Sequence, residues 1–251
     1  MGLNAATAMA AWFPAPNLLH LPSGEMHLWR ADAESFSMHE RMLTALLSKA
    51  ELEKANRFKQ KRDRNRSILA RAVLRDILGR YMDINPRCLQ FLVTDRGKPI
   101  LNPETHANAP RFSVSHSRNI ILIAFAREHD IGVDVESVRT DLDVIEMAQR
   151  FFAPSELDEL LGLPATSRVR AFFDGWTRKE AYLKARGEGI GSGLDRFAVT
   201  MAPGEPARLI SDDRYPEQVA LWCLCDIPFG SDYAAAVAIH NCALRTRHWV
   251  W

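Results

Sequence analysis

The amino-acid sequence predicts an α+β fold made of two similar halves, a pseudo-dimer related by a pseudo-two-fold axis. At 251 residues the chain has room for one large domain or two small ones. Sliding the sequence over itself by about 105 residues aligns several short segments at one nearly constant offset, as an internal repeat would. We therefore expect halves at residues 1–128 and 129–251. A cleft between two such halves would hold the active site.

The expected elements follow the same order in both halves. Each half should begin with a strand, continue through helices that end in one long helix, and finish on an apolar strand. In chain order the matched segments are 26–30 with 131–135, 50–52 with 155–157, 64–81 with 168–186, 90–94 with 196–200, and 120–126 with 233–239. The alternative is that these weak matches arise by chance, because many α+β halves share this order.

The repeat alignment also predicts how the halves differ. It places Asp134 on Trp29, Glu136 on Ala31 and Glu180 on Arg75. Only the second half would then carry these acids, so we expect one metal site rather than two.

Composition excludes several classes of protein. Lys and Arg number 32 against 31 Asp and Glu, for a net charge of +1, which argues against a nucleic-acid coat. No basic segment opens a signal peptide, and the longest apolar run, residues 120–126, is too short to span a bilayer. We expect a cytoplasmic protein that binds no membrane. The four cysteines, Cys88, Cys223, Cys225 and Cys242, lack zinc-site spacing, and Cys223 and Cys225 are expected to be a reduced, buried pair.

Two segments carry acids that could converge. Asp134 and Glu136 alternate on a predicted strand and so point to one side. Glu180 and Lys184 lie one turn apart on a predicted helix. Three carboxylates beside a lysine suit a hard divalent cation and an anionic substrate. The alternatives are a solvated strand face and an ordinary surface ion pair.

Three further segments could bind phosphate. Lys98 lies in a turn where Gly97 permits close approach and Pro99 stiffens the exit. Ser115 and His116 suggest a hydrolase, but neighbouring strand residues face opposite sides, so anion binding is the better interpretation and a buried structural histidine the alternative. Residues 57–66 hold six Lys or Arg, which could be a solvated helix face, a nucleic-acid contact or a polyphosphate contact.

With these residues identified, the chain resembles the Sfp-type 4′-phosphopantetheinyl transferases. The matching pieces are RGKPIL at 96–101, FSVSHS at 112–117, IGVDVE at 131–136, RFF at 150–152 and WTRKEAYLKARGEGI at 176–190. The similarity covers about residues 50–200 and is weak at both ends.

The resemblance implies transfer of the phosphopantetheine arm of coenzyme A to a carrier-protein serine, with Mg²⁺ as cofactor. It implies that Asp134, Glu136 and Glu180 bind the metal, and that Glu180 is also the candidate base. Asp134, Glu180 and Lys184 become the catalytic set. The implied coenzyme A contacts are Lys179 and Lys184 at the pyrophosphate, Ser115 and His116 at the nucleotide phosphates, and Arg96, Gly97, Lys98, Pro99, Lys54, Arg66 and Ser67 towards the adenine end.

The expected partner is an acyl, polyketide or peptidyl carrier protein, with residues 137–150 as the candidate contact. Because the interface between halves would be internal, we expect a monomer. Three rival functions remain open: a non-catalytic coenzyme A-binding module, a nucleic-acid-binding protein, and a metal-dependent phosphohydrolase that releases 3′,5′-ADP without a carrier.

Overall fold

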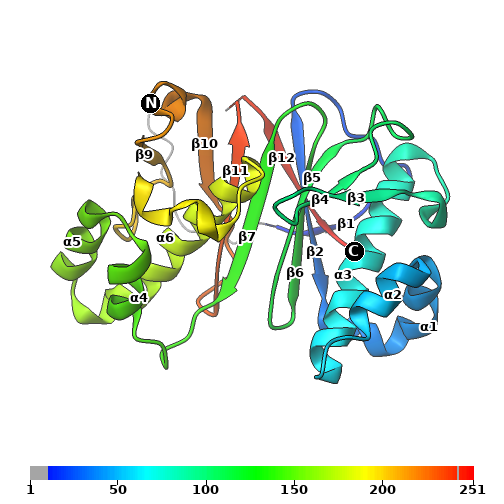
Figure 1. The fold of residues 1–251 in the computed structure, drawn as a ribbon, viewed down its shortest axis with the longest axis horizontal. Helices are drawn as coiled ribbons and strands as arrows, with labels where there is room; N and C mark the ends of the chain where they lie inside the picture. The colour runs from blue at the N-terminus through cyan, green and yellow to red at the C-terminus, as the bar shows by residue number, and fades with distance from the viewer. Residues whose placement is uncertain (1–10, 242) are drawn as a thin grey trace. The chain divides into compact units, whose positions relative to one another are not determined.

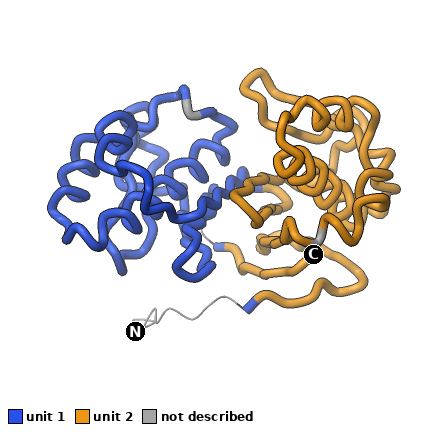
Figure 2. The backbone as a smooth tube through the Cα atoms, turned by 90° about the horizontal axis from the view of Figure 1, so that it is seen from below, with its two compact units in different colours: residues 1–11, 129–243 blue, residues 12–128, 244–251 orange. Residues whose placement is uncertain are grey.

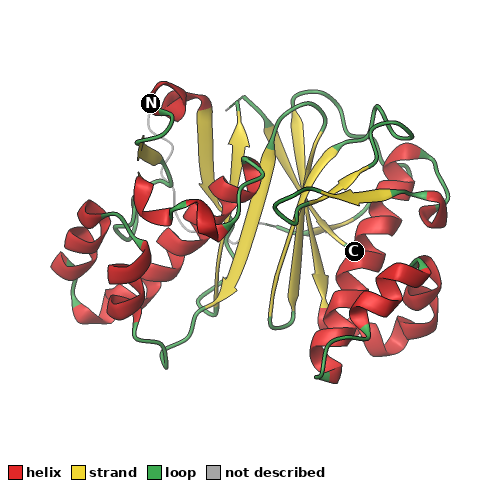
Figure 3. Ribbon diagram, viewed as in Figure 1, coloured by secondary structure: helices red, strands yellow, loops and turns green. Residues whose placement is uncertain are grey.

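The computed structural model describes residues 11–241 and 243–251, which form two compact units (Figure 2). The N-terminal unit comprises residues 12–128 and 244–251, and the C-terminal unit is built on residues 129–243. Each unit contains both helices and a sheet (Figure 3). The predicted α+β class with two mixed halves is therefore confirmed. The pseudo-two-fold axis and the cleft stay predictions.

The N-terminal unit packs its helices on a five-stranded sheet of order β1-β12-β2-β6-β5 (Figure 1). Buried side chains of α3 and of the sheet, such as Ile68 and Phe125, belong to one hydrophobic core. The elements are β1 (Phe13–Pro14), β2 (Glu25–Asp32), α1 (Phe36–Leu46), α2 (Lys49–Ala55), α3 (Lys61–Met82), the pair β3 (Phe91–Val93) and β4 (Pro99–Leu101), β5 (Arg111–Ser117), β6 (Ile120–Ala126) and β12 (Arg245–Val250).

The C-terminal unit has a three-stranded antiparallel sheet of order β10-β11-β7, against which α6 packs. Its elements are β7 (Ile131–Ser137), α4 (Val144–Phe151), α5 (Pro154–Gly162), α6 (Ala165–Ala185), the pair β8 (Phe197–Val199) and β9 (Leu209–Asp212), β10 (Trp222–Asp226) and β11 (Tyr233–His240). Strand β7 and helix α6 carry the acids that the sequence singled out.

Both units repeat one order of elements. Apart from β1 and β12 of the N-terminal unit, a first strand is followed by three helices, a two-stranded pair and two further strands. In each unit the last of these strands pairs antiparallel with the first, as β6 does with β2 and β11 with β7. The repeated segments read from the sequence therefore fall on corresponding elements.

The C-terminal strand departs from the expected boundary, which assigned residues 129–251 to one half. Strand β12 pairs in parallel with β2, with Arg245 opposite Glu25 and Val250 opposite Arg30. Trp251 adds a hydrogen bond from its Nε1 to Asp76 Oδ2 at 2.8 Å. Residues 244–251 thus belong to the N-terminal unit. This pairing joins segments more than two hundred residues apart, so no local sequence signal marks it.

The cysteine prediction is wrong. Cys225 is exposed with a free thiol, whereas Cys223 is in a disulfide bond. Along β10 the cysteines alternate with the buried Trp222 and Leu224, so they lie on the less buried face of the strand. Cys88 is also exposed and free, and Cys242 lies outside the described residues. In the described part of the chain, no helix is long and apolar enough to cross a membrane.

Candidate active site

Helix α6 lies unusually close to strand β7. A Cβ atom added to Gly132 would lie 2.0 Å from the Ala181 carbonyl oxygen and 2.3 Å from the Ala185 nitrogen. On the neighbouring strand the residues paired with Gly132, Asp134 and Glu136 are all alanines, at 238, 236 and 234. Small residues therefore let the helix backbone rest directly on the sheet. Alternation along β7 turns Asp134 and Glu136 to the same face as Gly132.

The predicted acids interact on this face. Lys184 Nζ donates a hydrogen bond to Asp134 Oδ1 at 2.6 Å. Asp134 is 3% exposed and Glu180 is 8% exposed. The pKa of the Glu180 carboxyl is raised to about 7, mainly by burial and also by the charges of Asp134 and Glu136, with Lys184 opposing the shift. The four side chains therefore form one group of interacting charges, and Glu180 can hold or release a proton near neutral pH.

The donor chemistry of this group suits a hard divalent ion. The Oε1 atom of Glu180 is buried and accepts no hydrogen bond from the described residues. Three carboxylates with an orphaned oxygen are what a magnesium ion would satisfy. Even so, among the described residues no group of three or more His, Cys, Asp or Glu side chains is placed to hold a metal ion. Lys184 instead neutralises Asp134.

Lys179 does not join this group, contrary to its predicted place at the pyrophosphate. Its side chain is fully buried, and Nζ donates to Glu156 Oε2 at 2.5 Å and to the Phe197 carbonyl. Burial raises the pKa of the Glu156 carboxyl, which the Lys179 charge and two backbone N–H donors oppose. Neighbouring helical residues point about 100° apart, so Lys179 and Glu180 cannot face the same partner.

The predicted turn at Lys98 is present in the N-terminal unit between β3 and β4. The Gly97 nitrogen donates to the Thr94 carbonyl at 2.8 Å, and Thr94 Oγ1 accepts from the Lys98 nitrogen at 3.1 Å. Gly97 has φ +83°, which a residue with a side chain rarely adopts. Arg96 and Gly97 are exposed, and Lys98 and Pro99 are half-buried.

The other predicted coenzyme A contacts lie on three further elements of the same unit. On β5, Ser115 is buried and His116 is exposed, as their adjacent positions on a strand require. Lys54 is exposed on α2. Arg66 and Ser67 are half-buried on α3, where Arg66 bonds Asp63 at 3.0 Å.

Buried ion pairs show how the two long helices correspond. In the C-terminal unit Glu156 pairs with Lys179, and in the N-terminal unit Glu51 pairs with Arg75 at 2.9 Å. Each glutamate accepts a hydrogen bond from the N-cap nitrogen of its own short helix, Glu51 from Ser48 and Glu156 from Ala153. Lys179 is therefore the counterpart of Arg75, and the predicted match of Glu180 with Arg75 is one residue out.

With that correction Glu180 corresponds to Asp76 and Lys184 to Arg80. Asp76 accepts the Trp251 hydrogen bond, and the Arg80 guanidinium lies over the Trp29 ring at 5.7 Å. The long helix of the N-terminal unit thus carries an acid and a base at these two positions. On the neighbouring strand, however, Trp29 occupies the position that corresponds to Asp134, and the acid and base contact aromatic rings.

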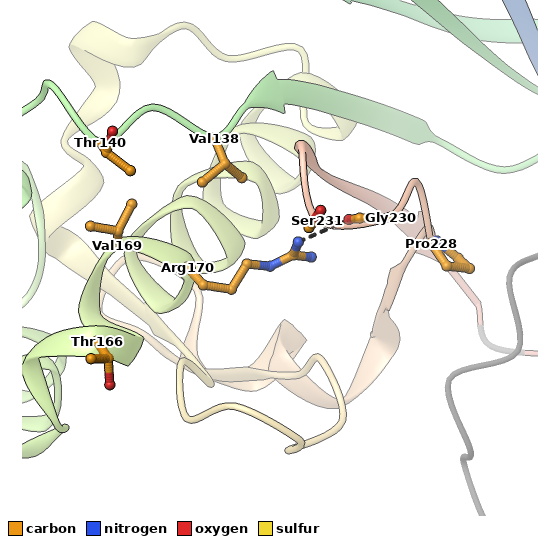
Figure 4. A pocket seen from close by; sticks show the side chains of 8 residues that line it. All are labelled: Val138, Thr140, Thr166, Val169, Arg170, Pro228, Gly230 and Ser231. Carbon is orange, nitrogen blue, oxygen red and sulfur yellow. Dashed lines mark hydrogen bonds between the residues drawn. The ribbon is translucent and has the colours of Figure 1, made fainter.

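A cavity of about 640 Å³ opens beside the end of β7 (Figure 4). Arg170 reaches across it, donating to Asp174 Oδ1 at 2.9 Å and to the Gly230 carbonyl at 3.1 Å. Its lining residues are Val138, Thr140, Thr166, Val169, Arg170, Pro228, Gly230 and Ser231. No sequence motif marks this cavity, since its walls come from three distant segments.

Two family models cover most of the chain. The 4′-phosphopantetheinyl transferase superfamily model matches residues 130–238, and the 4′-phosphopantetheinyl transferase N-terminal model matches residues 27–128. The 4′-phosphopantetheinyl transferase HetI of a Nostoc species is 37% identical, over 95% of this chain and 97% of that protein. The 4′-phosphopantetheinyl transferase Sfp of Bacillus subtilis is 30% identical, over 65% of this chain and 70% of that protein.

The putative 4′-phosphopantetheinyl transferase of a Synechocystis species is 39% identical, over 61% of each chain. The HetI likeness extends along nearly the whole sequence and includes both units. The chain belongs to the 4′-phosphopantetheinyl transferase superfamily of enzymes.

Proposed function

We propose that this enzyme transfers the 4′-phosphopantetheine arm of coenzyme A to a serine of an acyl or peptidyl carrier protein. The observation that carries the proposal is the buried Glu180, with a pKa of about 7, facing Asp134 and Lys184. A carboxyl group poised near neutral pH can accept a proton from an incoming hydroxyl, and the lysine can offset charge on a phosphate.

The reaction is a direct displacement. The serine hydroxyl oxygen attacks the β-phosphorus of coenzyme A, and the bond from that phosphorus to the bridging oxygen breaks. The bridging oxygen leaves on 3′,5′-ADP with the negative charge, and the serine proton passes to Glu180 directly or through a water. Lys184 stands 2.6 Å from Asp134, where its ammonium can also face a pyrophosphate oxygen. Positioning and charge neutralisation supply the catalysis.

Asp134, Glu136 and Glu180 are the residues that would hold Mg²⁺. Their carboxylates have the chemistry this ion prefers, and the orphaned Glu180 oxygen supports the assignment. When bound, the ion would neutralise the pyrophosphate oxygens of coenzyme A. Because Lys184 holds Asp134 in the structure described here, the ion and this lysine would compete for the same carboxylate.

The N-terminal unit is proposed to bind the nucleotide of coenzyme A. Arg96, Gly97, Lys98 and Pro99 present a turn with exposed backbone, and Lys54, Arg66, Ser67, Ser115 and His116 add charged or hydroxyl groups. Lys179 is left out of the proposed contacts because its amine is buried against Glu156.

Residues 137–150 are proposed to contact the carrier protein. They follow directly on the strand that bears Asp134, and Val138 and Thr140 line the cavity beside that strand's end. A mostly apolar hollow with an arginine on one wall suits a partner that offers an apolar side chain beside an acid.

Mass spectrometry of apo carrier protein incubated with coenzyme A, Mg²⁺ and the enzyme tests the function. The carrier should gain the mass of one phosphopantetheine arm, and Asp134→Ala should abolish the gain while circular dichroism stays unchanged. Release of 3′,5′-ADP without any carrier would indicate a phosphohydrolase instead. Coenzyme A binding without transfer to any of a panel of carriers would indicate a binding module.

A further inference from the structure

Three consecutive residues of α6 point to three different neighbours. Successive helical side chains lie about 100° apart, so they must face different directions. Arg178 reaches Asp226 on β10, with hydrogen bonds of 2.8 and 2.6 Å, and also donates to the Thr200 carbonyl. Lys179 reaches Glu156 on α5. Glu180 faces the acids of β7. The rotation of α6 about its own axis therefore decides where Glu180 points.

Glu156 is the centre of a buried network that joins three elements, α5, α6 and β8. Its Oε1 accepts from the Val199 nitrogen at 2.8 Å, and its Oε2 accepts from the Ala153 nitrogen at 2.8 Å. Lys179 Nζ completes this network and also bonds the Phe197 carbonyl. Glu156 is 1% exposed and Lys179 is 0% exposed. Water cannot substitute for either partner, so the side-chain directions are fixed by these bonds.

We propose that Glu156 and Lys179 are positioning residues that fix the rotation of α6 and thereby hold Glu180 towards Asp134. The inference rests on the proposed function. It assigns Lys179 a structural role, which is compatible with its complete burial. A lysine held in this way contacts no phosphate. The hydrogen bonds of Glu156 run to Lys179, Val199 and Ala153, so we expect its effect on catalysis to pass through Lys179 and α6.

The two roles for Lys179 predict different kinetics. If Lys179 binds the pyrophosphate, Lys179→Met raises KM for coenzyme A and Glu156→Gln does not. If the pair positions α6, both substitutions lower kcat by about 100-fold, because displacement of a reacting group by about 1 Å costs that much. KM for coenzyme A then stays within about twofold.

The double variant Glu156→Gln/Lys179→Met separates positioning from stability. Each single substitution leaves a buried group without its partner and lowers Tm, whereas removing both charges restores Tm towards the wild-type value. Positioning predicts that kcat stays low in the double variant and falls no further than in the worse single variant. The double variant also keeps the test valid if a single variant does not fold.

Glu51→Gln is the matched control, because Glu51 makes the corresponding, partly buried pair with Arg75 in the N-terminal unit. It should lower Tm by a similar amount and leave the geometry around Glu180 unchanged. Crystal structures give the second measurement: the Lys184–Asp134 hydrogen bond of 2.6 Å should be lost in the double variant and kept in Glu51→Gln.

Recovery of kcat together with Tm in the double variant would overturn the proposal, as would an intact Lys184–Asp134 bond in its crystal structure. A rise in KM for coenzyme A confined to Lys179→Met would do the same. If the wild-type enzyme modifies no carrier, the proposed function fails, and the crystal structures still decide whether the pair sets the direction of α6.

Discussion

Replacing Gly132 by alanine should disable the enzyme without unfolding it. The added Cβ would lie 2.0 Å from the Ala181 carbonyl oxygen, about 1.4 Å short of ordinary van der Waals contact. The three obstructing atoms, this oxygen and the nitrogen and Cα of Ala185, are all helix backbone, so no side chain can turn aside. The remaining adjustment is for α6 to move away from β7 by about 1 Å, taking Glu180 and Lys184 with it.

The magnitude follows from that displacement. Overpacking of this kind costs about 1–3 kcal/mol of unfolding free energy. For a chain of this size we expect Tm to fall by about 2–12 °C. A misplacement of about 1 Å between reacting groups lowers the rate about 100-fold. Initial rates of carrier-protein modification, followed by mass spectrometry, and Tm from calorimetry measure the two effects separately.

Gly175→Ala on the same helix is the matched control. A Cβ there would meet only the flexible side chain of Met201, at 3.1 Å and beyond, and alanine favours the helix by up to about 1 kcal/mol. This variant should keep the wild-type rate. Wild-type kcat in Gly132→Ala, or an equal loss in Gly175→Ala, would show that the close approach of α6 to β7 does not place the catalytic group.

Three further predictions concern charge, metal and the C-terminal strand. Because the pKa of Glu180 is raised from 4.5 to about 7, this group binds more protons in the folded than in the unfolded chain between those values. In metal-free protein its contribution to the unfolding free energy should therefore decrease as pH rises through that window, and Glu180→Gln should flatten the slope measured by urea titration; an unchanged slope would contradict the raised pKa. Removing divalent ions with EDTA should abolish carrier modification, and Mg²⁺ but not Na⁺ should restore it; full activity in EDTA would remove the metal from the mechanism. Deleting residues 244–251 removes the β12–β2 pairing and the Trp251–Asp76 bond, so Tm should fall by several degrees, whereas Trp251→Phe should lose only about 1 kcal/mol of unfolding free energy; equal Tm values for the deletion and wild type would show that β12 adds no stability.

The order of elements in the two units was predictable because periodicity is local. Alternation at β7 and helical spacing in α6 place Asp134 with Glu136, and Glu180 with Lys184, before any fold is known. The repeat was visible for the same reason. The residue-by-residue alignment of the two halves was harder to predict. The long helices α3 and α6 align with an offset one residue shorter than the strands do, and this is visible only from the Glu51–Arg75 and Glu156–Lys179 pairs.

Lys179 shows where local inference ends. Its sequence neighbour Glu180 bears the proposed chemistry, yet a rotation of about 100° sends its amine into the core. The direction depends on Glu156, twenty-three residues earlier, and on the Val199 backbone beyond it. Such a contact follows from packing, which no residue spacing encodes.

The sequence by itself determined the α+β class, the repeated order of elements and the acids with their lysine, because each depends on spacing within one strand or helix. Tertiary structure alone decided that Lys179 is buried, that β12 joins the N-terminal unit and that Gly132 admits the backbone of α6. The physical reason is that these outcomes depend on contacts between segments far apart in the sequence. Such contacts decide which apolar surfaces are buried against each other and which oppositely charged group pairs with a buried charge.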